Sequence, residues 1–264
     1  MGLNEALAAL RAHLEHLREL GVREVDASPE RLAALKSLVR NATATAPTRA
    51  TTRIDSLPGL DPPQPSIGPA TESLEAIASE IAACKKCRLC EARTRVVPGQ
   101  GRLQPDILFV GEGPGEEEDR QGLAFVGRAG QLLTRMIEAM GYTRDDVFIG
   151  NIVKCRPPGN RTPLPDEMAA CLPFLERQIA VIRPKLIVAL GSTALKGLFG
   201  DASLSISRVR GTWMDYRGIP VMPTYHPAYL LRNPDAKREV WEDLKAVLQR
   251  LGRPLPRQSR RGAE

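Results

Sequence analysis

Residues 106–112, DILFVGE, form an apolar run that ends on a glycine and a glutamate. Such a run, bounded by turn residues, is typical of a strand buried on both faces of a sheet. Further strands are predicted at 146–153, at 185–191 and at the end of a hairpin covering 206–226. Helices are predicted at 129–141, at 165–182, from the third strand to Gly200, and at 235–252. Strands that alternate with helices in this way predict an α/β fold with a parallel sheet covered on both faces.

The stretch after the first strand, GEGPGEEEDRQGLAFVGRAGQLL (111–133), is rich in glycine and acids. A dinucleotide loop of the form G-x-G-x-x-G would need glycine at position 116, where a glutamate stands, and no Gly-Lys-Ser or Gly-Lys-Thr follows. The acids would also repel a phosphate, which prefers bare backbone N–H groups and positive charge. Glycines after a strand instead let the backbone approach a flat ligand, and a tight turn with a solvated acidic edge is the structural alternative.

Each predicted strand has a position of interest at its carboxyl end: Glu112, Asn151, Gly191 and His226. Parallel sheets bind ligands beyond the carboxyl ends of their strands, so we expect these positions to form a site at one edge. Each also has a structural alternative, since Asn151 could be a turn residue and His226 could cap a helix.

The folded domain is predicted at residues 72–252. Residues 1–40 contain two amphipathic helices, which form either a docking hairpin or a mobile appendage. Residues 41–71 are rich in Thr, Ala and Pro and predict a disordered linker. Residues 253–264 form a basic tail.

The composition bounds the class of protein. A formal net charge of +6 suits a polyanionic partner such as nucleic acid, although an ordinary basic protein is the alternative. Aromatic residues make up only 4% of the chain, so a row of base-stacking platforms is not expected. No apolar stretch reaches about 18 residues and the N-terminus lacks a secretory pattern, which predicts a cytoplasmic protein without a transmembrane helix.

In a reducing compartment the five cysteines are expected to be metal ligands, catalytic groups or core residues rather than disulfides. Cys84, Cys87 and Cys90 are each separated by two residues, and Cys155 and Cys171 follow much later. Two thiolates of a C-x-x-C turn can point at one ion, and two further cysteines would complete a four-ligand site. The spacing does not separate zinc from an iron–sulfur cluster, and it leaves the choice of four ligands open. Cys171 could also be a buried apolar residue of its helix.

Four motifs together resemble the family 4 uracil-DNA glycosylases, the iron–sulfur type: CKKCRLCEARTRVVPGQG, the stretch 111–133 quoted above, NIVKCRPPGNRTPLPDE and HPAYLLRNP. The similarity covers residues 84–252. It implies a three-layer α/β/α sandwich around a central, mainly parallel four-stranded sheet. It also implies a structural 4Fe-4S cluster on Cys84, Cys87, Cys155 and Cys171, with Cys90 as a spare thiol.

The resemblance implies a monofunctional enzyme of base excision repair, associated with the nucleoid through its substrate. Such an enzyme flips uracil out of single- or double-stranded DNA and hydrolyses the N-glycosidic bond, which leaves an abasic site. We expect no lyase activity, because we identify no lysine in the motifs that could form a Schiff base. A related branch bonds covalently to DNA through a histidine in an inserted basic loop. Residues 151–167 have no histidine and no such insertion, so we expect turnover. A monomer is expected, and the N-terminal helices are the candidate site for an unknown protein partner.

The resemblance also implies a role for single residues. Glu112 would orient the attacking water and stabilise the cationic sugar, and His226 would hydrogen-bond uracil O2. Asn151 would pair with O4 and N3–H, an edge that cytosine cannot match, and Phe125 would stack on the base unless it is a core residue. The remaining implied contacts are Gly113 at the base, Glu118 near C5 to exclude the thymine methyl group, and Leu230, Leu231 and Arg232 as a minor-groove wedge and phosphate contact.

Two other classes of function stay open at this point. One is a metal-stabilised DNA-binding or polymerase-associated module, and the other is an electron-transfer protein that uses its cluster. A binding module would not need Glu112, Asn151 and His226 together, so their joint presence favours the enzyme.

Overall fold

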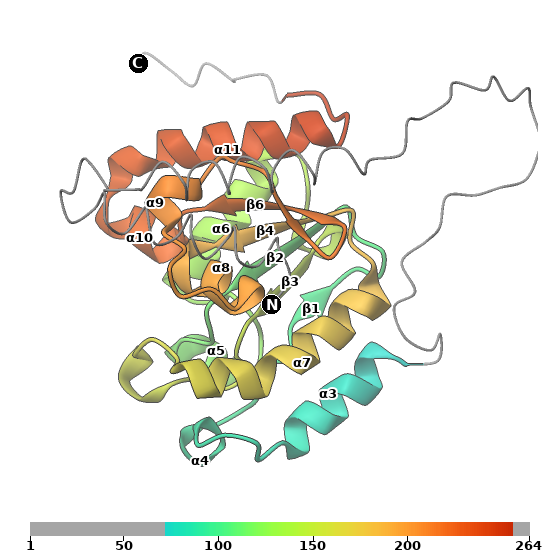
Figure 1. The fold of residues 1–264 in the computed structure, drawn as a ribbon, viewed down its shortest axis with the longest axis vertical. Helices are drawn as coiled ribbons and strands as arrows, with labels where there is room; N and C mark the ends of the chain where they lie inside the picture. The colour runs from blue at the N-terminus through green and yellow to red at the C-terminus, as the bar shows by residue number, and fades with distance from the viewer. Residues whose placement is uncertain (1–71, 256–264) are drawn as a thin grey trace, which may run out of the picture. The chain divides into compact units, whose positions relative to one another are not determined.

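The computed structural model describes residues 72–255, whose fold is drawn in Figure 1. The predicted N-terminal helices, the linker and most of the basic tail lie outside these residues. The strands are β1 (Gln100–Gly101), β2 (Ile107–Gly111), β3 (Phe148–Asn151), β4 (Leu186–Leu190), β5 (Met214–Tyr216) and β6 (Ile219–Thr224). The α-helices are α3 (Leu74–Ala83), α4 (Leu89–Ala92), α5 (Glu116–Gln121), α6 (Arg128–Ala139), α7 (Pro165–Ile182), α8 (Gly191–Phe199), α9 (Ile206–Val209), α10 (Pro227–Arg232) and α11 (Lys237–Arg250). Three 3-10 turns complete the list: η1 (Arg144–Asp146), η2 (Pro158–Asn160) and η3 (Pro234–Ala236).

The sheet has six strands in the order β1-β3-β2-β4-β6-β5. The four inner strands run parallel to one another, as predicted. The two edge strands β1 and β5 are antiparallel to their neighbours. The predicted number of four strands is therefore wrong. The edge strands contain only two and three residues, too short for a hydrophobic period to mark them.

Helices cover both faces of the sheet and make three layers. Along β2, Ile107 and Phe109 face one core cluster, whereas Leu108 and Val110 face the other. This alternation follows from the two-residue period of a strand, and burial on both faces explains why the whole strand is apolar. The first cluster is closed by α6 and α11, and the second by α3, α7 and α8. Figure 1 shows α11 on one side of the sheet and α7 with α3 on the other.

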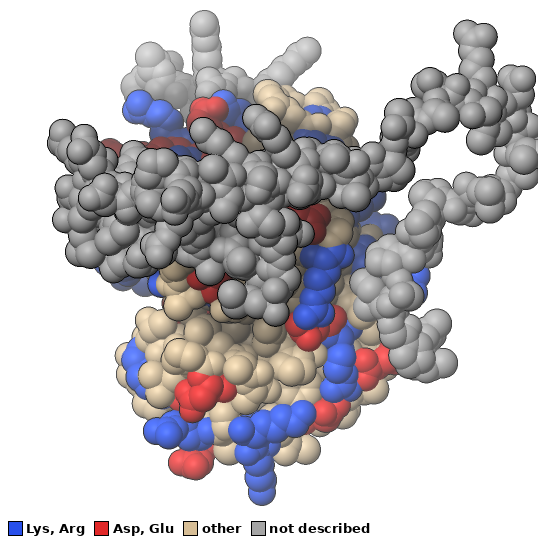
Figure 2. Space-filling view, viewed as in Figure 1, with Lys and Arg blue, Asp and Glu red and all other residues tan. Residues whose placement is uncertain are grey.

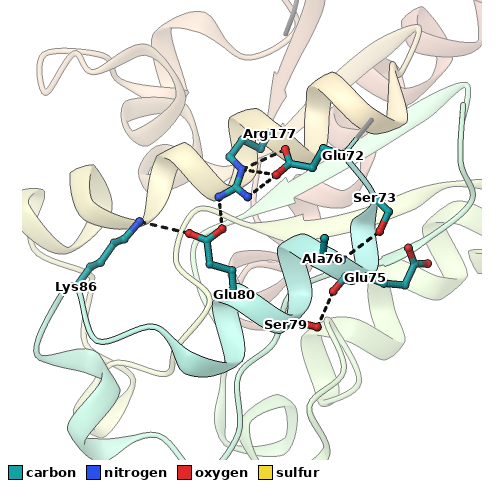
Figure 3. Close-up of polar contacts among 8 residues, drawn as sticks. All are labelled: Glu72, Ser73, Glu75, Ala76, Ser79, Glu80, Lys86 and Arg177. Carbon is teal, nitrogen blue, oxygen red and sulfur yellow. Dashed lines mark hydrogen bonds and ion pairs between the residues drawn. The ribbon is translucent and has the colours of Figure 1, made fainter. Parts of the chain in front are cut away.

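Ion pairs fix α3 against α7 (Figure 3). Arg177 on α7 binds the carboxylate of Glu72, and its Nη1 lies 2.6 Å from Oε2 of Glu80. Cys84 is the C-cap of α3, and Cys171 lies on α7. Arg177 therefore holds together two elements that each supply a predicted ligand of the cluster.

The carboxyl ends of the inner strands meet at one edge of the sheet. Gly111 pairs with Asn151 across β2 and β3, and Leu190 pairs with Thr224 across β4 and β6. Glu112 and His226 follow these strand ends, so the prediction that the strand-end residues share one edge is confirmed.

On the face drawn in Figure 2, Lys and Arg side chains lie between Asp and Glu over the coloured part of the surface. That part of the face has no large field of one sign. Within residues 72–255, no helix is both long enough and apolar enough to span a membrane.

Candidate active site

A cleft of about 530 Å³ opens at the carboxyl edge of the sheet. Its walls come from the segments after β2, β3 and β6 and from the loop that contains η2. The predicted site residues that line it are Glu112, Gly113, Glu118, Phe125, Asn151, His226 and Arg232. The fold therefore brings together residues that lie more than a hundred positions apart in the sequence.

Glu112 is the first residue after β2 and lines the cleft. Burial raises the pKa of its carboxyl above the ordinary value, and a hydrogen bond from the Thr193 hydroxyl partly offsets this shift. Thr193 lies on the first turn of α8, directly after β4, so the same strand-end rule could have marked it from the sequence.

Asn151 ends β3 and is 1% exposed. Its side-chain oxygen Oδ1 has no hydrogen-bond partner, and within residues 72–255 it is the one buried side-chain polar atom in that condition. An unsatisfied buried oxygen costs about 1–3 kcal/mol, so its presence in a cleft points to a ligand that donates to it.

Gly111 makes room for this arrangement. A Cβ atom at position 111 would lie 2.5 Å from Oδ1 of Asn151 and 2.4 Å from Cζ of Phe125. Only glycine lets the amide and the ring approach the end of β2 this closely.

Phe125 is 6% exposed and belongs to the core cluster as well as to the cleft wall, so both readings of the sequence apply to it. Its φ of 53° lies in the left-handed region, which is strained for a bulky residue. Arg144 donates to its carbonyl oxygen at 3.0 Å, and Glu118 accepts from the next two backbone N–H groups at 2.8 Å each. These bonds hold the ring, which lies 5.6 Å from the ring of His226 between centroids.

His226 caps α10, as the structural alternative supposed, and it lines the cleft as well. Its Nδ1 accepts a hydrogen bond from the backbone N–H of Ala228 at 3.1 Å. Burial, assisted by the nearby charge of Arg232, lowers the pKa of the imidazole to about 4. The ring is therefore neutral at pH 7, and because Nδ1 accepts, its proton sits on Nε2.

The acidic loop, whose purpose the sequence left open, divides its carboxylates among different tasks. Glu118 accepts from the backbone N–H groups of Gly115, Val126 and Gly127 and so closes the turn around α5. Asp119, 3% exposed, accepts from the backbone N–H groups of residues 94 and 95. Both acids therefore brace the loop, whereas Glu112 faces the cleft.

The predicted wedge needs a correction. Leu230 is 1% exposed and packs in the first core cluster, so it cannot enter a DNA groove without leaving the core. The wrong assignment came from treating adjacent residues alike, although neighbours on a helix point in different directions. Leu231 and Tyr229 are 36% and 38% exposed, and Arg232 lines the cleft.

A second, smaller pocket contains the sulfur atoms. Its wall is formed by apolar side chains, by three cations and by all five cysteines: Cys84, Cys87, Cys90, Cys155 and Cys171. Arg93 Nη1 lies 3.2 Å from Sγ of Cys155, and the backbone N–H of Lys154 donates to Sγ of Cys171 at 3.3 Å. Burial raises the pKa of the Cys171 thiol to about 11. Thiols of this kind become thiolates when a metal supplies positive charge, and N–H groups aimed at sulfur stabilise metal-bound thiolates.

Comparison with known proteins agrees with this geometry. The family model described as the uracil DNA glycosylase superfamily matches residues 98–245. A type-4 uracil-DNA glycosylase of Sulfurisphaera tokodaii is 50% identical over 184 residues, which cover 67% of this chain and 84% of the relative. The type-4 enzyme of Thermotoga maritima is 51% identical over 177 residues, which cover 66% of this chain and 92% of the relative. The type-4 enzyme of Saccharolobus solfataricus is 48% identical over 188 residues, covering 68% and 87%. The chain therefore belongs to the uracil-DNA glycosylase superfamily and, within it, to the type-4 uracil-DNA glycosylases.

Proposed function

We propose that this chain removes uracil from DNA by hydrolysis of the N-glycosidic bond and so starts base excision repair. The observation that supports this most strongly is the unpaired Oδ1 of Asn151, buried in the same cleft as Glu112 and His226. An oxygen kept without a partner suits a base edge that donates a hydrogen bond.

Uracil reaches such a cleft only if the nucleotide turns out of the base stack. Oδ1 of Asn151 then accepts the N3–H of uracil, and the amide N–H donates to O4. Cytosine presents an unprotonated N3 and an amino group at these positions, so it would leave the buried amide mismatched at both atoms. Phe125 stacks on the base from the wall that Glu118 holds in place.

Thymine differs from uracil by one methyl group at C5. We assign its exclusion to the wall that contains Glu118, whose two carboxylate oxygens are already bound by backbone N–H groups. Because three hydrogen bonds fix this wall, it cannot move to make room for the methyl group of thymine. Forcing an extra methyl group into a rigid site is costly.

Bond cleavage leaves positive charge on the sugar and negative charge on the departing uracil. Glu112 as a carboxylate orients the attacking water and stabilises the cationic sugar. Neutral His226 donates its Nε2–H to O2 of uracil, where negative charge develops. The hydrogen bond from Ala228 fixes this tautomer, so capping and catalysis use opposite nitrogens of one ring.

We keep the expectation of hydrolysis without lyase activity, but its stated reason needs correction. The motifs do contain lysines: Lys85 and Lys86 in the first and Lys154 in the third. Lys85 and Lys86 are not among the residues that line the cleft. Lys154 is 1% exposed and donates to Asn151 O and Gln178 Oε1. It has no access to a sugar carbon, so it is not placed to form a Schiff base.

We assign the DNA contacts to α10. Leu231, which is 36% exposed and precedes the cleft residue Arg232, serves as the wedge, and Arg232 supplies the phosphate contact.

The thiol pocket fits a 4Fe-4S cluster. Among residues 72–255, no three His, Cys, Asp or Glu side chains converge tightly enough to hold a single ion, whereas five thiols share the wall of one pocket. A cluster spreads its ligands over several iron atoms. We propose Cys84, Cys87, Cys155 and Cys171, the set that the resemblance to the iron–sulfur family implies, as its ligands. When bound, the cluster supplies a rigid crosslink between α3, the segment after β3, and α7.

Loss of one ligand is expected to remove the cluster, while loss of Cys90 is not. Cys171→Ala should lose bound iron and visible absorption and should lower the free energy of unfolding by several kcal/mol, because cluster binding is coupled to folding. Cys90→Ala, the matched control, should keep the iron content of the wild type. Iron analysis, absorption and thermal melting measure these outcomes. Iron loss in the control with retention in Cys171→Ala would reverse our choice of ligands.

The pH dependence of uracil release is expected to respond to Thr193. The active form of Glu112 is the carboxylate, so activity rises with pH through the raised pKa of this group. Thr193→Val removes the hydrogen bond that lowers that pKa, so the acid limb of kcat/KM should move to higher pH. Thr193→Ser, which keeps a hydroxyl, should leave the limb near its wild-type position. A limb that stays in place in Thr193→Val would show that another group controls it.

The decisive assay is strand breakage of an oligonucleotide with a single uracil after treatment with enzyme and alkali. Cleavage at uracil, with none at thymine or cytosine controls, is the expected result. Protein with a full iron content that binds the DNA but releases no uracil would favour the binding-module alternative. A cluster that cycles reversibly without any response to uracil-DNA would favour electron transfer.

A further inference from the structure

Lys154 is a buried cation that the proposed mechanism does not use. It is 1% exposed and lies three residues after Asn151, at the turn where the chain leaves β3. Its Nζ donates to the backbone carbonyl of Asn151 and to Oε1 of Gln178, each at 2.8 Å. Both partners are neutral oxygens. Lys154 also lines the pocket of the five cysteines, but neither of its hydrogen-bond partners carries a charge. Burying a cation in this way is costly, which argues that the position has a task.

The contacts of Lys154 connect the base pocket to the second helical layer. Gln178, 2% exposed on α7, donates through Nε2 to the carbonyl of Pro98 at 2.8 Å. The backbone of Lys154 is fixed at both ends, because its N–H donates to Sγ of Cys171 and its carbonyl accepts from Val97 at 2.8 Å. The ammonium group therefore binds the carbonyl of Asn151 from a position that is fixed by contacts with α7 and with the segment before β1.

The hydrogen bond from Nζ of Lys154 to the Asn151 carbonyl, here called the tether, acts on the main chain of Asn151. The side chain of Asn151 stays free for the ligand. The strand ladder itself continues only through Ile152 and Val153, whose N–H groups donate to the carbonyls of Gly111 and Glu112. A fixed carbonyl leaves the Asn151 side chain on the cleft side, where Oδ1 has no partner. The Ile152 N–H and the Asn151 carbonyl belong to one peptide group, so the bond from Lys154 gives this peptide a second hydrogen bond beside the one to Gly111. Without it the peptide can tilt about the remaining bond, and the Asn151 amide would shift from its place in the cleft.

We propose that Lys154 is a positioning residue that orients Asn151 for uracil recognition by holding its backbone carbonyl. The proposal rests on the proposed function. The proposed ligand Cys155 follows Lys154 in the chain, and the proposed ligand Cys171 accepts from the backbone N–H of Lys154. The tether and the cluster therefore depend on the same segment after β3.

The test is a double-mutant cycle between Lys154 and Asn151, measured as single-turnover release of uracil from DNA. Lys154→Met keeps the length of the side chain and removes its donors. We expect it to lower kcat/KM by roughly 10- to 100-fold, the range produced when a supporting group is lost. In an Asn151→Ala background the same substitution should have almost no further effect, because the group that it positions is already absent. Iron content and melting temperature are recorded for every variant.

Lys185→Met is the matched control. This lysine is exposed, precedes β4 at the edge of the sheet away from the cleft, and pairs with Asp106. It should behave as the wild type. Gln178→Met, which removes the second partner of the ammonium, should cause a smaller loss that also disappears in the Asn151→Ala background. It serves as the test variant if Lys154→Met does not accumulate as folded protein.

The proposal is overturned if Lys154→Met lowers kcat/KM by the same factor in the Asn151→Ala background as in the wild type and also loses iron. Lys154 would then be a counter-charge of the cluster. Unchanged kinetics in Lys154→Met or in Gln178→Met would overturn it as well. A wild-type protein that releases no uracil would instead overturn the proposed function, so the two failures are distinguishable.

Discussion

Glu112→Gln is expected to lower kcat for uracil release by roughly 10²- to 10⁴-fold, the range for loss of a positioned catalytic carboxylate. The amide keeps the size of the side chain but cannot stabilise a cationic sugar or polarise the water as an anion does. Affinity for uracil-DNA should change little, because we propose Asn151, Phe125 and Arg232 as the contacts to the bound nucleotide. Single-turnover kinetics gives the rate, and fluorescence anisotropy with a labelled oligonucleotide gives the affinity.

Glu117→Gln is the matched control for this experiment. Glu117 belongs to the same acidic loop, but it lies on the surface of α5 and pairs with Arg120. Its replacement should leave kcat within about twofold of the wild type, as expected for an exposed ion pair. Equal losses in both variants would mean that the loop, and not the carboxylate in the cleft, is what the reaction needs.

The central part of the fold could be predicted from the sequence because each inner strand has both faces buried. The helix predicted at 165–182 agrees with the bounds of α7, Pro165–Ile182, which continues through Pro173. Strands β1 and β5 could not be predicted, since edge strands of two and three residues are formed by pairing and not by a local pattern. Helix α5 was also missed, because its six polar residues form a helix only when their buried acids find backbone N–H partners.

The location of the site followed from the strand ends, but the roles within it depend on atoms. The sequence placed Glu118 near the base, and only the structure shows both of its oxygens committed to backbone N–H groups. Leu230 and Leu231 are adjacent, yet one is buried and the other exposed. Lys154 was overlooked because nothing in the motif predicts that its ammonium group donates to the carbonyl of Asn151.

His226 is the residue for which capping and catalysis must be separated. His226→Asn is expected to keep α10 folded, because asparagine is a strong N-cap and can accept from the N–H of Ala228. Stability should stay within a few tenths of a kcal/mol of the wild type. The shorter side chain cannot also reach O2 of uracil, so kcat should fall by roughly 10²- to 10³-fold, as for the loss of one donor to a developing oxyanion.

His226→Ala separates the two tasks further, since it removes cap and donor together. Its kcat should match that of His226→Asn, whereas its free energy of unfolding should be lower by the value of one cap, about 1 kcal/mol, with a correspondingly lower melting temperature. Because the pKa of His226 is lowered to about 4, this residue should contribute no limb to the wild-type rate near pH 6.5, the ordinary value for histidine. A limb at pH 6.5 that disappears in His226→Asn would mean that the imidazole titrates there and that the charged ring takes part. Full activity in His226→Asn would reduce this residue to a helix cap and leave the negative charge on uracil to another group of the cleft.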